Sequence, residues 1–233
     1  AGMATDPANI LITTGSLQGL DLVNGALLSP GDTVIVEDVS YGGALSRLRR
    51  CGVDYKSVKV DAGGMCMDGL ATVLGDLQGQ GIRPKYIYTI PTVQNPSGTV
   101  MSRERRQRML DLARQYGVPI FEDDCYADLL WEGDRPASIR SMDENGQVIY
   151  CGTFSKSIAP ALRIGYVVAD WPVMSRILPL KSDGGCGALE QMALAESCPD
   201  HFAGHVDKLR QTLKGKCETM TAALAEQFGD GLA

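Results

Sequence analysis

Short apolar runs rich in β-branched residues alternate along the chain with longer segments whose apolar residues recur at helical spacing. This alternation is typical of a parallel sheet covered by helices. The predicted strands are Ile10–Thr13, Thr33–Glu37, Val53–Val58, Tyr86–Ile90, Pro119–Glu122, Gln147–Cys151 and Ile164–Ala169. The predicted helices, most with Gly or Pro near their boundaries, are Leu17–Leu28, Tyr41–Cys51, Asp68–Leu77 and Arg103–Tyr116.

The pattern changes after Ala169, where strand-like runs become rare. Near the end of the chain, His201–Phe228 is predicted to form a long helix with an apolar face. The sequence contains no internal repeat, low-complexity tract or clear interdomain linker. We therefore expect a three-layer α/β/α fold with a mostly parallel central sheet.

Length and charge narrow the possible functions. With 233 residues the chain is long enough for one large domain or two small ones. Its net charge of -6 argues against a dominant role in binding nucleic acid or anionic membranes. No apolar run approaches the roughly 20 residues that cross a bilayer, and no secretory signal is visible at the start. A cytoplasmic protein that acts on small molecules is therefore expected.

Cysteine and histidine give no metal signature. The seven cysteines are scattered between Cys51 and Cys217 without CxxC pairs, so we expect reduced and mostly buried thiols. His201 and His205 are four residues apart and could share a helical face as a metal pair. Because no HExxH motif surrounds them, an ordinary helix face is favoured and no metal site is predicted.

The first motif with chemical content is a strand that turns through Gly15 into a helix starting near Ser16. Free backbone N–H groups and the positive end of a helix dipole favour an anion at such a place, and the Ser16 hydroxyl can add a donor. The motif therefore predicts a phosphate site. The alternative is that Ser16 is simply the helix N-cap.

The second motif, Gln94–Gly98, follows a predicted sheet strand. Open α/β folds place ligand groups at the carboxyl ends of their strands, and Asn95 offers both a hydrogen-bond donor and an acceptor there. A plain Asn-Pro turn is the alternative interpretation.

The third motif contains three consecutive carboxylates, Glu122, Asp123 and Asp124, at the end of an apolar strand. Carboxylates packed this closely repel one another, so a compensating cation or metal is expected nearby. A pyridinium nitrogen would serve. The alternatives are a solvated acidic loop and a carboxylate cluster that binds magnesium.

The fourth motif runs from Gly152 to Lys156 and is followed by Arg163 and another strand. A lysine with hydroxyls before it and an arginine after it suits a Schiff base beside a bound phosphate. Arg163 could hold that phosphate through two parallel N–H bonds. A surface lysine is the alternative, which the position of Lys156 between apolar strands disfavours.

A rival interpretation takes Thr153–Lys156 as a variant of the Ser-x-x-Lys acyl-enzyme motif. That chemistry needs a serine in the first place and companion Ser-Asp-Asn and Lys-Thr-Gly motifs. The stretch from Lys181 to Gly184 only faintly matches them, so this interpretation is disfavoured.

In their order and spacing the four motifs resemble fold-type I pyridoxal-phosphate (PLP) enzymes. The similarity is greatest to class I/II aminotransferases of the 2-aminoadipate and aromatic subgroup. The stretches that carry it are Ile12–Leu22, Gln94–Gly98, Glu122–Tyr126 and Gly152–Gly165. The resemblance implies that residues 1–233 form the PLP-binding large domain. The family's N-terminal segment and C-terminal small domain are expected to be absent from this chain.

The resemblance also implies roles for residues at the reacting end of the cofactor. Lys156 would form the Schiff base with PLP and then shuttle the proton between the substrate α-carbon and the cofactor. Asp123 would pair with the pyridine nitrogen and keep it protonated, whereas Asp124 lies in the wrong register. Asn95 and Tyr126 would hydrogen-bond the 3′ oxygen of PLP.

Further roles concern the ring face and the phosphate. Tyr41 matches the aromatic residue that stacks on the ring. Ser16, the backbone amide of Leu17, Thr153 and Arg163 would hold the phosphate. Sites of this family lie at a homodimer interface, so a homodimer is expected.

The implied function is transfer of an amino group between an L-α-amino acid and a 2-oxo acid. Dicarboxylic, aromatic and branched-chain substrates are all compatible with the sequence, and other PLP reactions use the same scaffold. The alternative is the PLP-sensing, aminotransferase-like domain of a winged-helix transcription regulator. Nucleic acid would be a partner only in such a fusion.

Overall fold

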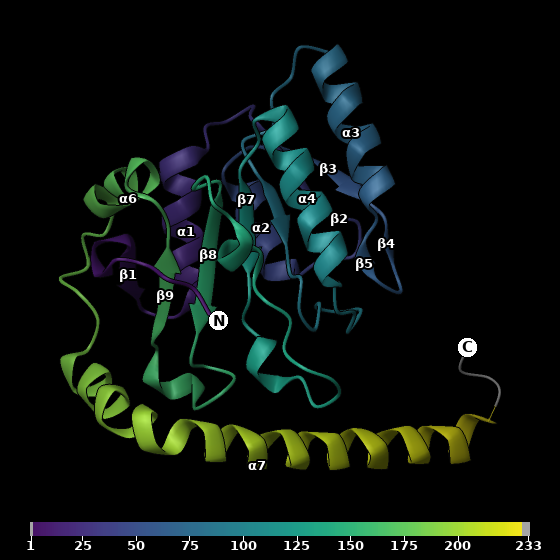
Figure 1. The fold of residues 1–233 in the computed structure, drawn as a ribbon, viewed down its shortest axis with the longest axis vertical. Helices are drawn as coiled ribbons and strands as arrows, with labels where there is room; N and C mark the ends of the chain where they lie inside the picture. The colour runs from purple at the N-terminus through teal and green to yellow at the C-terminus, as the bar shows by residue number, and fades with distance from the viewer. Residues whose placement is uncertain (1, 230–233) are drawn as a thin grey trace.

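A computed structural model describes residues 2–229 of the chain, which form a seven-stranded sheet with helices on both faces (Figure 1). In order along the sheet, its strands are β1 (Ile10–Thr13), β9 (Gly165–Val168), β8 (Val148–Thr153), β7 (Ile120–Asp123), β6 (Ile87–Thr89), β2 (Thr33–Glu37) and β3 (Asp54–Val58). The pairs from β8 to β3 are parallel. Strand β9 runs antiparallel to both of its neighbours. The expected mostly parallel sheet is confirmed.

Two hydrophobic cores, one on each face of the sheet, establish the three layers. The alternation of side chains along β2 places Val34 and Val36 in one core and Ile35 in the other. The first core packs against α1 (Ser16–Leu27), α2 (Gly42–Arg50) and α6 (Trp171–Ile177). The second packs against α3 (Met67–Gly79), α4 (Arg103–Tyr116) and α5 (Ile139–Met142). The expected three-layer α/β/α arrangement is therefore confirmed.

The longest helix, α7 (Ala188–Phe228), lies across one end of the sheet and extends past it (Figure 1). It contacts the turns that follow β7 and β8, where Arg210 donates to the Asp128 carbonyl and Phe202 packs against Phe154. The helix begins at Ala188, so the predicted start at His201 was wrong. Pro199 lies inside it at an exposed position and removes one intrahelical hydrogen bond.

The other predicted elements agree with the structure to within two residues at each end, and α4 has the predicted bounds. Sequence analysis did not predict the small hairpin formed by β4 (Val60–Asp61) and β5 (Gly64–Met65). It also missed α5, α6 and four short 3₁₀ helices. These missed segments have no more than seven residues each, too few for a periodic pattern to be read.

The cysteines are free thiols, but the expectation that most are buried was wrong. Cys151 is buried, Cys217 is exposed and the other five are partly exposed. Several lie at element ends, such as Cys51 at the end of α2 and Cys66 before α3. His201 and His205 lie on an exposed part of α7. No helix within residues 2–229 is both long and apolar enough to cross a membrane.

Arg106, on α4, is a fully buried cation that ties three segments together. Its guanidinium donates to the carbonyl oxygens of Met101 (2.9 Å) and Pro91 (2.8 Å) and to that of Ala137 (3.3 Å). The carboxylate of Glu122, also fully buried, lies 3.9 Å away. Each polar group here therefore depends on Arg106 for a partner or for charge compensation.

Replacing this cation should be strongly destabilising. We expect Arg106→Leu to lower the free energy of unfolding by about 3–5 kcal/mol, because it leaves three carbonyl groups without their donor and removes the cation beside the buried Glu122. Urea unfolding measures the change. Arg114→Ala, at an exposed position of the same helix, is the control and should change stability by less than about 0.5 kcal/mol. An unfolding midpoint of Arg106→Leu equal to that of the wild type would refute this role.

Glu37, the last residue of β2, is a second buried ionisable group. Burial raises the pKa of its carboxyl from 4.5 to about 7, and the negative charge of Asp123 acts in the same direction. Hydrogen bonds from Gln94, Thr89 and Ile90 act in the opposite direction. In the folded chain Glu37 therefore keeps its proton at pH values where the unfolded chain has lost it.

This shift predicts a dependence of stability on pH. The contribution of Glu37 to the free energy of unfolding is present below pH 4.5 and declines as the pH rises to about 7, because only the unfolded chain ionises in that window. Urea unfolding of the wild type and of Glu37→Gln at about pH 5 and about pH 7 tests it. The decline should be smaller in the variant, and an equal decline in both proteins would contradict it.

Candidate active site

A cavity of about 360 Å³ lies at the edge of the sheet where β6, β7 and β8 have their carboxyl ends. All residues predicted to contact a cofactor line this cavity, together with four others. The lining residues are Ser16, Leu17, Tyr41, Ile90, Asn95, Asp123, Cys125, Tyr126, Thr153, Ser155, Lys156, Pro160 and Arg163. The structure therefore brings the four sequence motifs together, while the role of each residue stays a prediction.

One corner of the cavity is formed by the amino end of α1. Gly15 is the N-cap of this helix, with a positive φ of 78°, and Ser16 is its first residue. The alternative that Ser16 is the N-cap is therefore wrong. A side chain at position 15 would collide with the guanidinium of Arg163, which donates to the Thr14 carbonyl at 3.1 Å. The helix amides and this arginine together make the corner favourable for an anion.

Arg163 reaches this corner from an unusual backbone conformation. Its φ of 52° lies in the left-handed region, which non-glycine residues rarely adopt. The residue caps a short 3₁₀ helix, Pro160–Leu162, and lies two positions before the first residue of β9. Two positions later, a side chain on Gly165 would overlap the backbone of Gly15 and Ser16. The close approach of these two segments thus requires glycine.

Lys156 lies on the turn after β8, and its side chain is exposed. Lys156 lies between the apolar strands β8 and β9 in the sequence, as predicted, but the expectation that this position keeps it from the surface was wrong. Its Nζ lies 5.7 Å from the centre of the Tyr126 ring. Thr153 is buried, and its hydroxyl donates to the Ile164 carbonyl at 3.2 Å. That bond fixes the base of the turn that presents the amine.

Asp123 is the last residue of β7 and is 4% exposed. One carboxylate oxygen accepts from the Tyr88 hydroxyl and the other from the Cys125 thiol, both at 2.7 Å. Burial raises the pKa of Asp123, whereas these two hydrogen bonds lower it. The carboxylate therefore reaches the cavity with both oxygens already held by the protein.

The three consecutive carboxylates separate because strand residues alternate between faces. Asp124, on the opposite side from Asp123, pairs with Arg135 at 3.0 Å and accepts from the Tyr150 hydroxyl at 2.9 Å. Glu122 accepts from two backbone amides at 2.8 Å. The compensating cations expected for this motif are thus arginines. All three carboxylates are buried, so the alternative of a solvated acidic loop was wrong.

No group of three or more potential metal ligands lies close together within residues 2–229. This observation removes the support for the alternative of a magnesium-binding carboxylate cluster at the third motif. The chemistry available at the cavity is that of an amine, a carboxylate and an anion-binding corner.

Asn95, Tyr126 and Tyr41 also line the cavity. The side-chain amide of Asn95 donates to the Tyr126 hydroxyl at 3.2 Å, so these two polar groups enter the cavity as a pair. Burial raises the pKa of the Tyr126 hydroxyl, while the hydrogen bond from Asn95 lowers it. Tyr41 immediately precedes α2 as its N-cap, rather than being its first residue.

Sequence analysis assigned no role to the residues that hold the predicted site residues in place. Tyr88 and Cys125 hold Asp123, and Glu37 with Gln94 holds the segment around Asn95. Cys125 lies in the turn after β7, two residues from Asp123, so its place in the third motif was the local signal that could have indicated it. The contacts of Tyr88 and Glu37 join distant parts of the sequence and leave no local signal.

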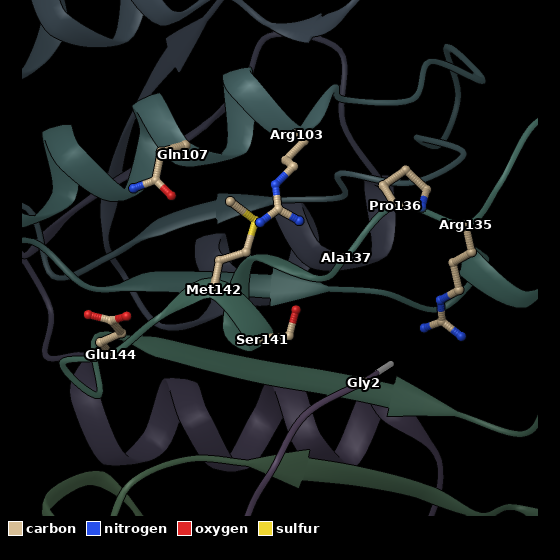
Figure 2. A pocket seen from close by; sticks show the side chains of 9 residues that line it. All are labelled: Gly2, Arg103, Gln107, Arg135, Pro136, Ala137, Ser141, Met142 and Glu144. Atoms are coloured by element: carbon tan, nitrogen blue, oxygen red, sulfur yellow. The ribbon is translucent and has the colours of Figure 1, made fainter.

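A larger cavity of about 700 Å³ lies between the start of α4 and the segment from Arg135 to Glu144. Figure 2 shows Arg103 and Gln107 extending from α4 toward the segment that carries Ser141 and Met142. None of the residues predicted for cofactor binding lines it. Size alone therefore does not identify the candidate site, and the convergence of strand-end motifs does.

Known proteins are similar to this chain in sequence and in fold. The chain is 36% identical to aromatic-amino-acid aminotransferase 1 of Thermococcus litoralis over 96% of its own length and 54% of that protein. It is 34% identical to the uncharacterized HTH-type transcriptional regulator YdfD of Bacillus subtilis over 96% of its length and 46% of that protein. The chain thus spans about half the length of these relatives.

A solved structure shows the same fold. It is that of the alpha-aminoadipate aminotransferase LysN from Thermus thermophilus, complexed with N-(5'-phosphopyridoxyl)-L-leucine. The TM-score is 0.90 at 31% identity, covering 98% of this chain and 58% of that one. The family model of aminotransferase class I and II matches residues 1–233. This chain therefore belongs to the aminotransferase class I and II family.

Proposed function

We propose that residues 1–233 form the PLP-binding large domain of an aminotransferase that transfers an amino group between an L-α-amino acid and a 2-oxo acid. PLP is the cofactor of this family. The observation that carries the proposal is the convergence of Lys156, Asp123 and the anion-binding corner on one cavity. These three features match the aldehyde, the pyridine nitrogen and the phosphate of PLP.

The chemistry of the residues present fits this cofactor. Ser16, the Leu17 amide, Thr153 and Arg163 would hold the phosphate, because hydroxyls, helix amides and a guanidinium all stabilise an anion. Asp123 would face the ring nitrogen, since a buried carboxylate held by neutral donors needs a cationic partner. Tyr41 offers an aromatic surface for the ring.

In the proposed reaction, each polar residue of the cavity would bind, donate or move a proton. When bound, the cofactor supplies an electron sink for the pair left behind when the substrate α-carbon loses its proton. Lys156 Nζ would hold the cofactor covalently and, once released, move that proton. Asp123 would keep a proton on the ring nitrogen. Asn95 and Tyr126 would donate to the 3′ oxygen and so set the basicity of the nitrogen at Lys156.

We further propose a cytoplasmic homodimer that binds amino acids and 2-oxo acids. The support is the family resemblance, in which two subunits meet at the site. The identity of the amino acid would be decided by groups that contact its side chain and carboxylate.

A second candidate function is PLP sensing within a transcription regulator. The specific observation that favours it is the 34% identity to the regulator YdfD over 96% of this chain. Because an aminotransferase-like sensor would keep the same cofactor residues, the site does not separate the two functions. A basic helix-turn-helix segment encoded upstream of Ala1 in the full-length gene would favour the regulator.

The covalent assignment is tested by adding PLP to the purified protein. We expect an absorbance band in the visible or near-ultraviolet that borohydride fixes onto Lys156, because the amine is exposed at the cavity. The band should be lost in Lys156→Ala and kept in Lys85→Ala, where the lysine lies at the opposite end of β6. Persistence of the band without Lys156 would show that the assignment is wrong.

The role of Asp123 is tested by Asp123→Asn in the full-length protein. The variant should retain cofactor but lose amino-transfer activity by at least about 100-fold, because an amide cannot hold the ring nitrogen protonated. Steady-state kinetics at saturating PLP measure the loss. Asp124→Asn tests the register, since this carboxylate pairs with Arg135 instead, and its activity per folded protein should exceed that of Asp123→Asn. Wild-type turnover in Asp123→Asn would exclude the role.

A further inference from the structure

Glu37 is a buried carboxylate that lies outside the cavity lining and yet contacts the segments that form it. One oxygen accepts from the Thr89 hydroxyl at 2.7 Å and from the Ile90 amide at 3.2 Å. The other accepts from the side-chain amide of Gln94 at 2.9 Å. These partners are all neutral donors, so the Glu37 side chain is held in place by hydrogen bonds and not by a paired cation.

Gln94 has every hydrogen-bonding position of its side chain in use. Its NH₂ group donates to Glu37 and to the Val39 carbonyl, the latter at 2.6 Å. Its oxygen accepts from the Ser97 amide at 2.8 Å and the Ser97 hydroxyl at 2.6 Å. Because Glu37 and Val39 both present acceptors, the amide has only one workable orientation. The direction in which the Gln94 side chain lies is therefore fixed by Glu37 together with the Val39 carbonyl and Ser97.

This pair connects two segments that each deliver a residue to the cavity. Val39 lies two residues before Tyr41, and Gln94 directly precedes Asn95, whose amide donates to the Tyr126 hydroxyl at 3.2 Å. Tyr41 and Asn95 both line the cavity. A change at Glu37 would thus displace both the Tyr41 ring and the hydrogen-bonded pair of Asn95 and Tyr126.

We infer that Glu37 is a positioning residue of the cofactor site, which acts through Gln94 to place Asn95 and Tyr41 against the bound ring. The inference rests on the proposed function, in which Asn95 and Tyr126 donate to the 3′ oxygen of PLP. Glu37 touches neither substrate nor cofactor. Its effect is to fix where these two donors lie, and thereby how strongly the 3′ oxygen holds the proton shared with Lys156 Nζ.

Glu37→Gln is the direct test, because it keeps the size of the side chain but turns an NH₂ group toward donors. In the full-length protein, the affinity for PLP should fall by about tenfold. The pH midpoint of the visible absorbance band should rise by about one unit, because a 3′ oxygen that has lost donors attracts the shared proton more strongly. Both are measured by absorbance titration and do not depend on turnover.

Asp143→Asn separates positioning from general destabilisation. Asp143 is also a buried carboxylate that accepts from backbone amides, those of Asn145 at 2.9 Å and Val148 at 2.8 Å, but it lies beside the amino end of β8. This control should lower thermal stability and leave the pH midpoint unchanged. A midpoint that moves equally in both variants would overturn the inference.

A double-variant cycle with Asn95→Ala tests the route of the effect. If Glu37 acts through Asn95, Glu37→Gln should shift the midpoint less when Asn95 is already absent than when it is present. Additive shifts would overturn the inference. Should Glu37→Gln fail to fold, Gln94→Ala cuts the same link while keeping Glu37, and a wild-type midpoint in that variant would overturn it. Absence of a Lys156-dependent band in the wild type would instead refute the proposed function.

Discussion

The parallel alignment of β2, β6, β7 and β8 is the constraint on which the rest of the site depends. Parallel strands end at the same edge of a sheet, so the segments after them are brought together whatever their separation in sequence. Glu37, Asp123 and Thr153 each close one of these strands. A cavity with several polar walls follows from the topology, and the residue types at the strand ends determine its chemistry.

Several carboxyl groups are buried near this edge of the sheet, and the structure stabilises them in two ways. Where strand residues face away from the cavity, arginines compensate them, as Arg135 does for Asp124 and Arg106 for Glu122. Where they support the cavity, neutral donors hold them, as for Asp123 and Glu37. Asp123 keeps capacity to pair with a cation because its neighbours supply none.

Local signals explain what could be predicted from the sequence. The bounds of α4 were predicted because Ser102 caps its start and Gly117, with φ of 64°, ends it. The four motifs were found because strand, turn and functional residue are adjacent in the chain. The pairing of Glu37 with Gln94 joins residues 57 positions apart and could not be predicted, since only the sheet topology brings them together. The exposure of Lys156 was missed because it depends on how the turn between β8 and β9 packs, which apolar strands on either side of it in the sequence do not indicate.

Because β9 runs antiparallel to β8, the lysine and the arginine of the site are carried by the same loop. Thr153 and Gly165 are directly opposite each other in the antiparallel pair, so the residues between them form one closed loop anchored at a single rung of the ladder. Lys156 and Arg163 both belong to that loop. The length of this loop therefore limits how far apart the amine and the guanidinium can lie. An insertion there would alter the span available to a ligand held at both ends, without disturbing the sheet.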